Sequence, residues 1–151
     1  MSVLASKFDI TRGYPNGALE EDFPIKKTGT TYETIPAGHL VVPEADAAGA
    51  AVISAGTTPD TSQTDNAPVW LVVEGNDDFS GDYVKKAHCL RLGSGLIWET
   101  DQFAAGTYAV STPVSFSAGK IKVKGSNEQI IGYVVANEVT ARGVLRIADT
   151  A

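Results

Sequence analysis

Two histidines and one cysteine are the side chains of this chain best suited to nucleophilic or metal chemistry. They are His39, His88 and Cys89, and only the last two are close in sequence. His88 and Cys89 are adjacent within a predicted strand, where successive side chains point to opposite faces. They therefore cannot form a nucleophile–base pair or ligate one metal ion without a distorted backbone. We expect Cys89 to be a small buried residue without a catalytic role.

The oxygen-rich segment 74–82 offers the best metal-binding pattern. It has oxygen donors and a glycine spaced like the start of a calcium loop. These residues are Asn76, Asp78, Ser80, Gly81 and Asp82. The acidic residue that should close such a loop is missing, because Ala87 stands at its position. The segment also lies between predicted strands rather than helices, so the pattern favours a solvated hairpin turn over a metal site.

Motifs that carry catalysis are absent from the sequence. It has no Gly-Lys-Ser/Thr phosphate loop, no Gly-x-Ser-x-Gly elbow and no His-Glu-x-x-His zinc motif. Carboxylates are adjacent at Glu20–Glu21 and at Asp77–Asp78, but such neighbours on exposed turns are usually hydrated. We therefore expect that the protein is not an enzyme and uses neither a metal nor a cofactor.

The composition is that of an acidic chain of one-domain length. Its 151 residues carry 12 Lys and Arg against 18 Asp and Glu, a formal net charge of −6. The lysines are scattered, whereas nucleic-acid binding needs a basic patch, so no nucleic-acid partner is expected. No signal-peptide pattern is present, and no stretch approaches the roughly 20 apolar residues of a membrane span. We expect folding in a cytoplasm, no membrane partner and no intramolecular disulfide.

A short phrase that recurs three times bears on the architecture. It reads Ile-Pro-Ala-Gly-His-Leu-Val-Val at 35–42, Phe-Ala-Ala-Gly-Thr-Tyr-Ala-Val at 103–110 and Phe-Ser-Ala-Gly-Lys-Ile-Lys-Val at 116–123. Glycine tolerates positive φ at a tight corner, and the segments that follow it favour strands. We interpret each copy as a turn that begins a strand.

Strand-forming segments recur at short intervals from residue 35 onward. Residues 69–73 form a near-continuous apolar run that is typical of a central buried strand. Residues 44–51 are small and polar, which favours a loop with one turn of helix. The long polar segment 55–68 favours a binding or disordered loop. About nine or ten short strands separated by Gly and Pro predict an all-β fold, either a small barrel or a sandwich.

The first 34 residues differ from the rest because apolar residues are sparse in them. We expect residues 1–34 to form an extended N-terminal arm and residues 35–151 a single β-domain. Such an arm would rest on another molecule, and a chain lacking residues 2–30 would still fold. The alternative is one or two edge strands on the same domain. The expected partner-contact residues are Phe8, Ile10, Tyr14, Leu19, Phe23 and Ile25.

The arm, the Ala-Gly corners and the C-terminal motifs together resemble the capsid decoration, or cement, proteins of tailed bacteriophages. The similarity is closest over residues 103–147, where Ala-Gly-Lys, Ile-Gly-Tyr-Val and Arg-Gly-Val-Leu succeed one another. The resemblance implies a structural virion protein on the outer capsid surface that stabilises contacts between major capsid protein subunits. It also implies assembly in the host cytoplasm, no catalytic role and self-association, with a homotrimer favoured and a dimer possible.

Two other functions fit the same strand pattern. One is a different phage structural β-domain, from a tail or baseplate. The other is a carbohydrate-binding β-sandwich, which would present exposed aromatic side chains on one face. The candidates for such a face are Trp70, Trp98, Tyr83 and Tyr108, and we expect Trp70 to lie in the core instead.

Overall fold

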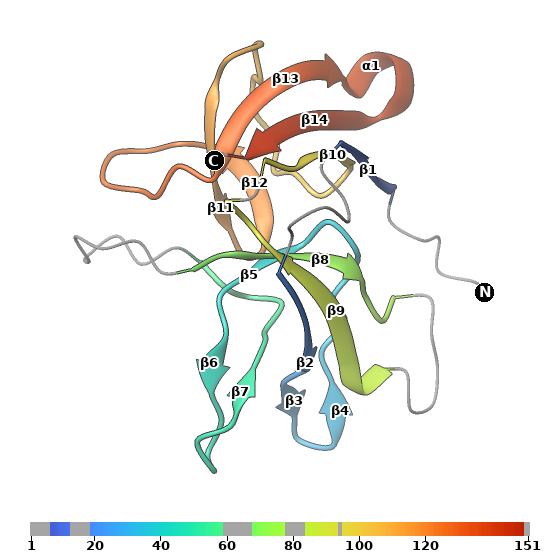
Figure 1. The fold of residues 1–151 in the computed structure, drawn as a ribbon, viewed down its shortest axis with the longest axis vertical. Helices are drawn as coiled ribbons and strands as arrows, with labels where there is room; N and C mark the ends of the chain where they lie inside the picture. The colour runs from blue at the N-terminus through green and yellow to red at the C-terminus, as the bar shows by residue number, and fades with distance from the viewer. Residues whose placement is uncertain (1–6, 13–18, 59–67, 78–83, 94, 150–151) are drawn as a thin grey trace.

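The computed structural model describes residues 7–12, 19–58, 68–77, 84–93 and 95–149. These residues form two main antiparallel sheets, two small hairpins and one short helix (Figure 1). The six-stranded sheet contains, in spatial order, β1 (Phe8–Arg12), β10 (Ile97–Thr100), β14 (Val144–Asp149), β13 (Gly132–Glu138), β11 (Pro113–Ser117) and β12 (Lys120–Val123). The four-stranded sheet contains β2 (Glu20–Pro24), β9 (Lys86–Arg91), β8 (Trp70–Glu74) and β5 (Leu40–Val41).

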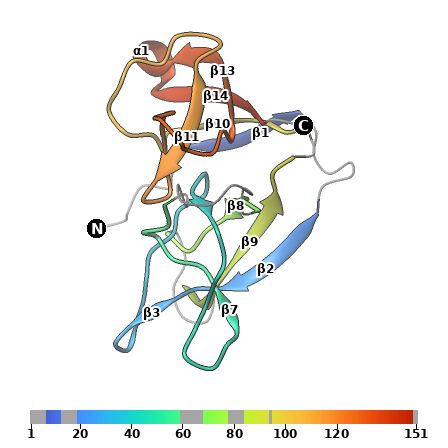
Figure 2. The same ribbon diagram turned by 90° about the vertical axis from the view of Figure 1, so that its left-hand side faces the viewer.

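The smaller elements lie at the ends of the molecule. One hairpin pairs β3 (Lys27–Thr28) with β4 (Thr31–Tyr32). The other pairs β6 (Glu44–Ala45) with β7 (Ala51–Val52). The helix α1 (Val139–Arg142) connects β13 to β14. Figure 2 shows the six-stranded sheet at one end of the long axis, the four-stranded sheet in the middle and the hairpins at the other end.

The prediction of an all-β fold is confirmed, and the sandwich is the arrangement that the chain adopts. The alternative of a closed barrel is wrong, because over the described residues the strands form separate sheets with ends. The apolar run of β8 is a central strand as predicted, since β8 lies between β9 and β5. Residues 44–51 are not helical but form the β6–β7 hairpin.

The two main sheets pack face to face around an inter-sheet core. Leu40, Leu71 and Leu90 point into it from the four-stranded sheet, and all three are fully buried. Trp98 and Phe116 are its largest members from the six-stranded sheet. Because burial of one such side chain contributes about 1.5–3 kcal/mol, this core is the main source of stability in the sandwich.

A second core, the hairpin-side core, covers the opposite face of the four-stranded sheet. Val41, Val72 and Cys89 point into it from β5, β8 and β9. Phe23 and Ile25 complete it from the N-terminal segment. The four-stranded sheet is thus buried on both faces, which explains why β8 is apolar almost throughout instead of alternating.

The N-terminal segment belongs to the sheets of its own chain, which corrects the prediction of an arm resting on another molecule. β1 pairs with β10 at the edge of one sheet, and β2 pairs with β9 at the edge of the other. Phe23 is 9% exposed and Ile25 is 3% exposed, so both side chains belong to the core of their own chain. Phe8 and Ile10 are half-buried against the inter-sheet core. The alternative of edge strands on the same domain therefore describes this segment.

The other two predicted contact residues are Leu19 and Tyr14. Leu19 is 59% exposed, and its role as a contact stays a prediction. Tyr14 lies outside the described residues.

Two of the three Ala-Gly phrases are turns that begin strands, as predicted. Gly38 has φ +92° shortly before β5, and Gly119 has φ +77° directly before β12. The third copy does not begin a strand. Its Tyr108 is buried instead, and the hydroxyl donates to the Ala104 carbonyl at 2.7 Å.

The two turn-forming copies pack against each other and join the sheets. The Leu40 N–H at the start of β5 donates to the Gly119 carbonyl at 2.8 Å. The His39 ring occupies the space where a Cβ on Gly119 would lie. Its Nε2–H donates to the Ala55 carbonyl at 2.8 Å, and burial lowers the pKa of His39, so the buried ring is neutral. The repeated phrase therefore has a packing role where the two sheets meet.

We expect Gly119→Ala to lower the free energy of unfolding by about 3 kcal/mol, because positive φ and overpacking both oppose a Cβ there. Gly29→Ala is the matched control. Gly29 also has positive φ, +65°, but a Cβ would meet no atom within 4 Å. We expect the control to lose about 1 kcal/mol, the backbone cost alone. Urea unfolding measures both, and equal losses would contradict the proposed contact between the turns.

We also expect a variant lacking residues 2–30 to lose cooperative folding. Each main sheet loses an edge strand, and the hairpin-side core loses Phe23 and Ile25. Deletion of two large buried side chains alone costs about 5 kcal/mol or more, comparable to the whole stability of a domain. Circular dichroism during heating tests this, and a cooperative transition near the Tm of the full chain would contradict it.

Candidate functional site

The two adjacent residues with reactive side chains lie on opposite faces of β9, as predicted. Cys89 is fully buried in the hairpin-side core. Burial, reinforced by the charge of Asp22, raises the pKa of its thiol to about 12, so the thiol stays protonated at neutral pH. His88 faces the other way, and its Nδ1 lies 2.6 Å from Asp22 Oδ1 and its Nε2 3.6 Å from Glu20 Oε1.

The electrostatics of His88 differ from those of His39. Partial burial disfavours the charged ring of His88, but hydrogen bonds and charge from Asp22 and Glu20 outweigh it and hold the pKa of His88 above its usual value. The two carboxylates of the neighbouring strand β2 therefore favour the protonated form of His88. The contact joins β9 to β2 across the sheet and stabilises the edge strand.

Asn76, the first oxygen donor in the calcium-like pattern of segment 74–82, has a structural role. Its Oδ1 accepts the Ile35 N–H at 2.7 Å, and its Nδ2 donates to the carbonyls of Glu33 and Val84 at 2.9 Å each. Residues 78–83, which hold the other oxygen donors of the pattern, lie outside the described residues. Across the ranges that are described, no group of three or more His, Cys, Asp and Glu side chains could hold a metal ion.

The aromatic side chains that a carbohydrate site would need are largely inside the protein. Trp98 is fully buried and Tyr108 is 2% exposed. Trp70 is half-buried and packs edge-on against Phe23, with ring centroids 5.0 Å apart. Trp70, which we expect in the core, is only partly buried and packs against the hairpin-side core from its rim, whereas Tyr83 lies outside the described residues.

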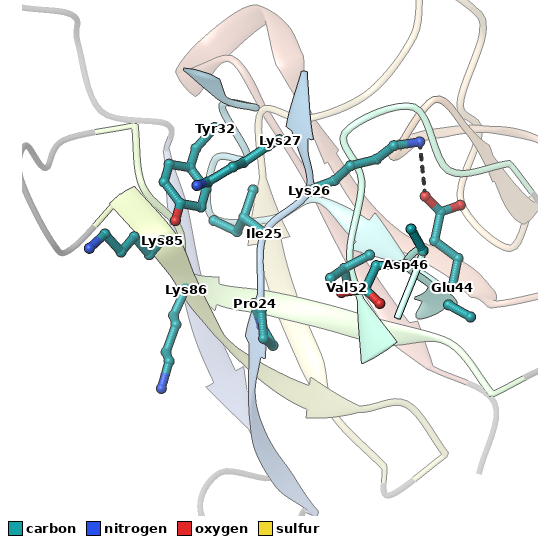
Figure 3. A pocket seen from close by; sticks show the side chains of 12 residues that line it. Pro24, Ile25, Lys26, Lys27, Tyr32, Glu44, Asp46, Val52, Lys85 and Lys86 are labelled. Carbon is teal, nitrogen blue, oxygen red and sulfur yellow. Dashed lines mark ion pairs between the residues drawn. The ribbon is translucent and has the colours of Figure 1, made fainter. Parts of the chain in front are cut away.

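A groove lies between the two hairpins and the start of β9 (Figure 3). We call it the hairpin groove, and its volume is about 640 Å³. It is lined by Pro24, Ile25, Lys26, Lys27, Tyr32, Glu44, Ala45, Asp46, Ala47, Val52, Lys85 and Lys86. Four lysines and two carboxylates therefore surround an apolar floor, in a chain whose overall charge is negative.

Sequence reasoning missed this groove. The lysines come from two places 59 residues apart, at 26–27 and 85–86, and the carboxylates come from the β6–β7 hairpin. Two Lys-Lys pairs were the available signal in the sequence. Only the pairing of β2 with β9, which sets Pro24 opposite Lys86, brings the two pairs together.

The backbone of β2 has a short open edge. In an antiparallel pair, alternate residues direct their N–H and C=O groups toward the partner strand. The Ile25 N–H donates to the Lys85 carbonyl at 2.9 Å, so the odd-numbered residues of this segment face β9. Glu20 and Asp22 then direct their backbone groups to the opposite side, where no described strand pairs with them.

The open edge of β2 ends at Pro24. The Pro24 carbonyl accepts the Ile53 N–H, and the Lys26 N–H donates to the Ile53 carbonyl, both at 2.9 Å. A residue at position 24 directs its N–H away from β9, so the missing N–H of Pro24 removes no bond from the β2–β9 ladder. The free backbone groups of β2 are thus confined to its acidic first half.

β1 has an open edge of the same kind. The Asp101 N–H donates to the Lys7 carbonyl at 3.0 Å, and Asp9 pairs with Glu99 in the same register. The backbone groups of Phe8 and Ile10, between them, face away from β10. Over the described residues, β1 has no neighbour on that side.

A network of ion pairs around the buried Glu99 carboxylate lies on the outer face of the six-stranded sheet. The Glu99 side chain is 7% exposed and receives hydrogen bonds from Arg142, at 2.7 Å to Oε2, and from Arg146. Arg142 also bonds Glu138 at 2.8 Å. These hydrogen bonds lower the pKa of Glu99 to about 2, so it is ionised at neutral pH. The network fastens the α1 turn to β10.

Comparisons with known proteins provide no relative for this chain, because no family model, no curated protein and no solved structure matches it. The helix that the structure describes has four residues and is far too short to cross a membrane. Functional inference therefore depends on the residues and their geometry.

At pH 7 we expect Glu99→Gln to lower the free energy of unfolding by about 3 kcal/mol, because two guanidinium groups lose their buried carboxylate. A depressed pKa means that the stabilisation is present above the ordinary pKa of 4.5 and is lost as pH falls toward 2. The deficit of the variant should therefore shrink between these two pH values. Urea unfolding across pH tests this.

The control for this prediction is Glu44→Gln. The Glu44 side chain is 47% exposed and pairs with an equally exposed Lys26 at 3.1 Å. We expect its removal to cost less than about 1 kcal/mol at every pH. A deficit at Glu99 that did not change with pH would contradict the assignment of the stabilisation to the ionised carboxylate.

Proposed function

We propose that this chain is a structural virion protein that decorates the outer surface of a phage capsid. It binds the major capsid protein and stabilises the contacts between capsid subunits. The observation that carries the proposal, beside the sequence resemblance, is that each main sheet ends in an open edge strand, β1 or β2. Open edges present unpaired backbone groups to which a segment of another protein can add as a further strand.

The physical logic of decoration matches such surfaces. A shell filled with nucleic acid is pushed outward, and it fails at the seams between its subunits. A protein that binds only the closed, expanded lattice stabilises that lattice by mass action. Self-association, as a homotrimer or a dimer, lets one particle touch several capsid subunits and gain avidity from individually weak contacts.

The open edge of β2 is the capsid contact that this proposal favours. Its free backbone groups belong to Glu20 and Asp22, whose side chains are exposed. The acidic side chains keep the edge soluble and prevent two copies from pairing there by repulsion. A capsid segment with basic or polar side chains meets no such repulsion. The edge therefore favours a different partner over a second copy of itself.

We expect Asp22→Pro to lose capsid binding and Asp22→Ala to keep it. Both variants remove the carboxylate that contacts His88, but only proline removes the outward N–H and blocks an added strand. One or two lost hydrogen bonds correspond to an affinity about tenfold lower. Co-sedimentation with empty, expanded shells measures the bound copies per shell, and thermal unfolding verifies that both variants fold.

The same assay separates the possible outcomes. Equal binding of the two variants would reject β2 as the contact. Failure of the unmodified chain to pellet with shells would reject decoration itself, and co-sedimentation with purified tails instead would favour the tail or baseplate alternative. Sedimentation equilibrium of the free protein measures self-association.

A further inference from the structure

We infer that the hairpin groove binds an extended acidic peptide segment. The identity of the partner, the major capsid protein, rests on the proposed function, whereas the chemistry of the ligand rests on the groove alone. The groove lies beyond the point where Ile53 closes the edge of β2, so it is a separate surface from the open edge.

The floor of the groove is apolar and can accept side chains. Ile25 and Val52 are buried beneath it, and Pro24 lies at its surface. A volume of about 640 Å³ is in the usual range for ligand sites, which are concave and mostly apolar with a few polar groups that fix orientation.

The two carboxylates of the groove are already engaged. Glu44 pairs with Lys26 at 3.1 Å, as the dashed line in Figure 3 shows. Asp46 Oδ1 accepts the N–H groups of Ala48 and Ala50, at 2.9 Å each, and so shapes the β6–β7 turn. The charge of Glu44 is therefore compensated by Lys26, whereas Asp46 keeps its charge, and the lysines that line the groove outnumber its carboxylates by four to two.

The opposite wall is cationic. Lys27 lies with its Nζ 4.8 Å from the centroid of the Tyr32 ring. Lys85 and Lys86 lie on the other side of the Pro24–Ile25 segment from Glu44 and Asp46, with their side chains diverging (Figure 3). Lys86 is exposed, and no described carboxylate forms an ion pair with it. Ammonium groups above an apolar floor select a ligand that carries both carboxylates and apolar side chains.

An extended peptide has that combination at the right spacing. Successive side chains of a strand point to opposite sides, so carboxylates can face the lysine wall while alternate apolar side chains lie on the floor. A long polyanion such as nucleic acid fits less well, because the chain carries a net charge of −6 and would repel it outside the groove.

The test uses a fluorescein-labelled heptapeptide, Glu-Val-Glu-Thr-Glu-Val-Glu, and fluorescence anisotropy at low salt. We expect saturable binding to the full chain and an affinity at least about tenfold lower for the double variant Lys27→Glu, Lys86→Glu. The matched control is Lys120→Glu, Lys124→Glu, which makes the same change in net charge at β12 of the other sheet. The control should bind within about twofold of the unmodified chain.

Several results would overturn the inference. These are no binding of the heptapeptide, equal binding of its glutamine analogue, equal loss in both double variants, or tighter binding of an oligothymidylate of the same length.

Co-sedimentation with shells separates the two proposals. Shell binding without peptide binding would reject the groove and leave decoration, whereas peptide binding without shell binding would reject the capsid partner and leave the ligand chemistry.

Discussion

The contact between two Ala-Gly turns is the constraint on which the sandwich depends. The Leu40 N–H donates to the Gly119 carbonyl, and the His39 ring fills the space that a Cβ on Gly119 would need. One turn begins β5 of the four-stranded sheet and the other begins β12 of the six-stranded sheet. Their meeting sets the distance between the sheets, and the inter-sheet core of large apolar side chains fits that distance.

The N-terminal segment contributes one edge strand to each of the two main sheets of the sandwich. It supplies β1 to one sheet and β2 to the other, so the same two strands both complete the fold and provide its open edges. Edge strands of this kind carry a risk of self-pairing, which the acidic first half of β2 and Pro24 reduce. The segment is therefore structural and still the most accessible backbone for a partner.

Charge is distributed unevenly over an acidic protein. The acidic half of β2 lies on one side of the point where Ile53 closes its edge, and the lysines of the hairpin groove lie on the other. Glu99, at the far sheet, is paired with two arginines and serves stability. Two neighbouring surfaces of opposite sign suit a protein that makes more than one contact with a larger assembly, as the proposed function requires.

The sequence by itself determined the all-β class, the central position of 69–73, the burial of Cys89 and two turns at Gly38 and Gly119. These follow from local properties: apolar runs, side-chain alternation and the freedom of glycine. Tertiary structure alone decided where β1 and β2 pair, because sparse apolar residues become buried when a distant strand accepts them. It also decided the hairpin groove, since lysines distant in sequence meet only through the β2–β9 register.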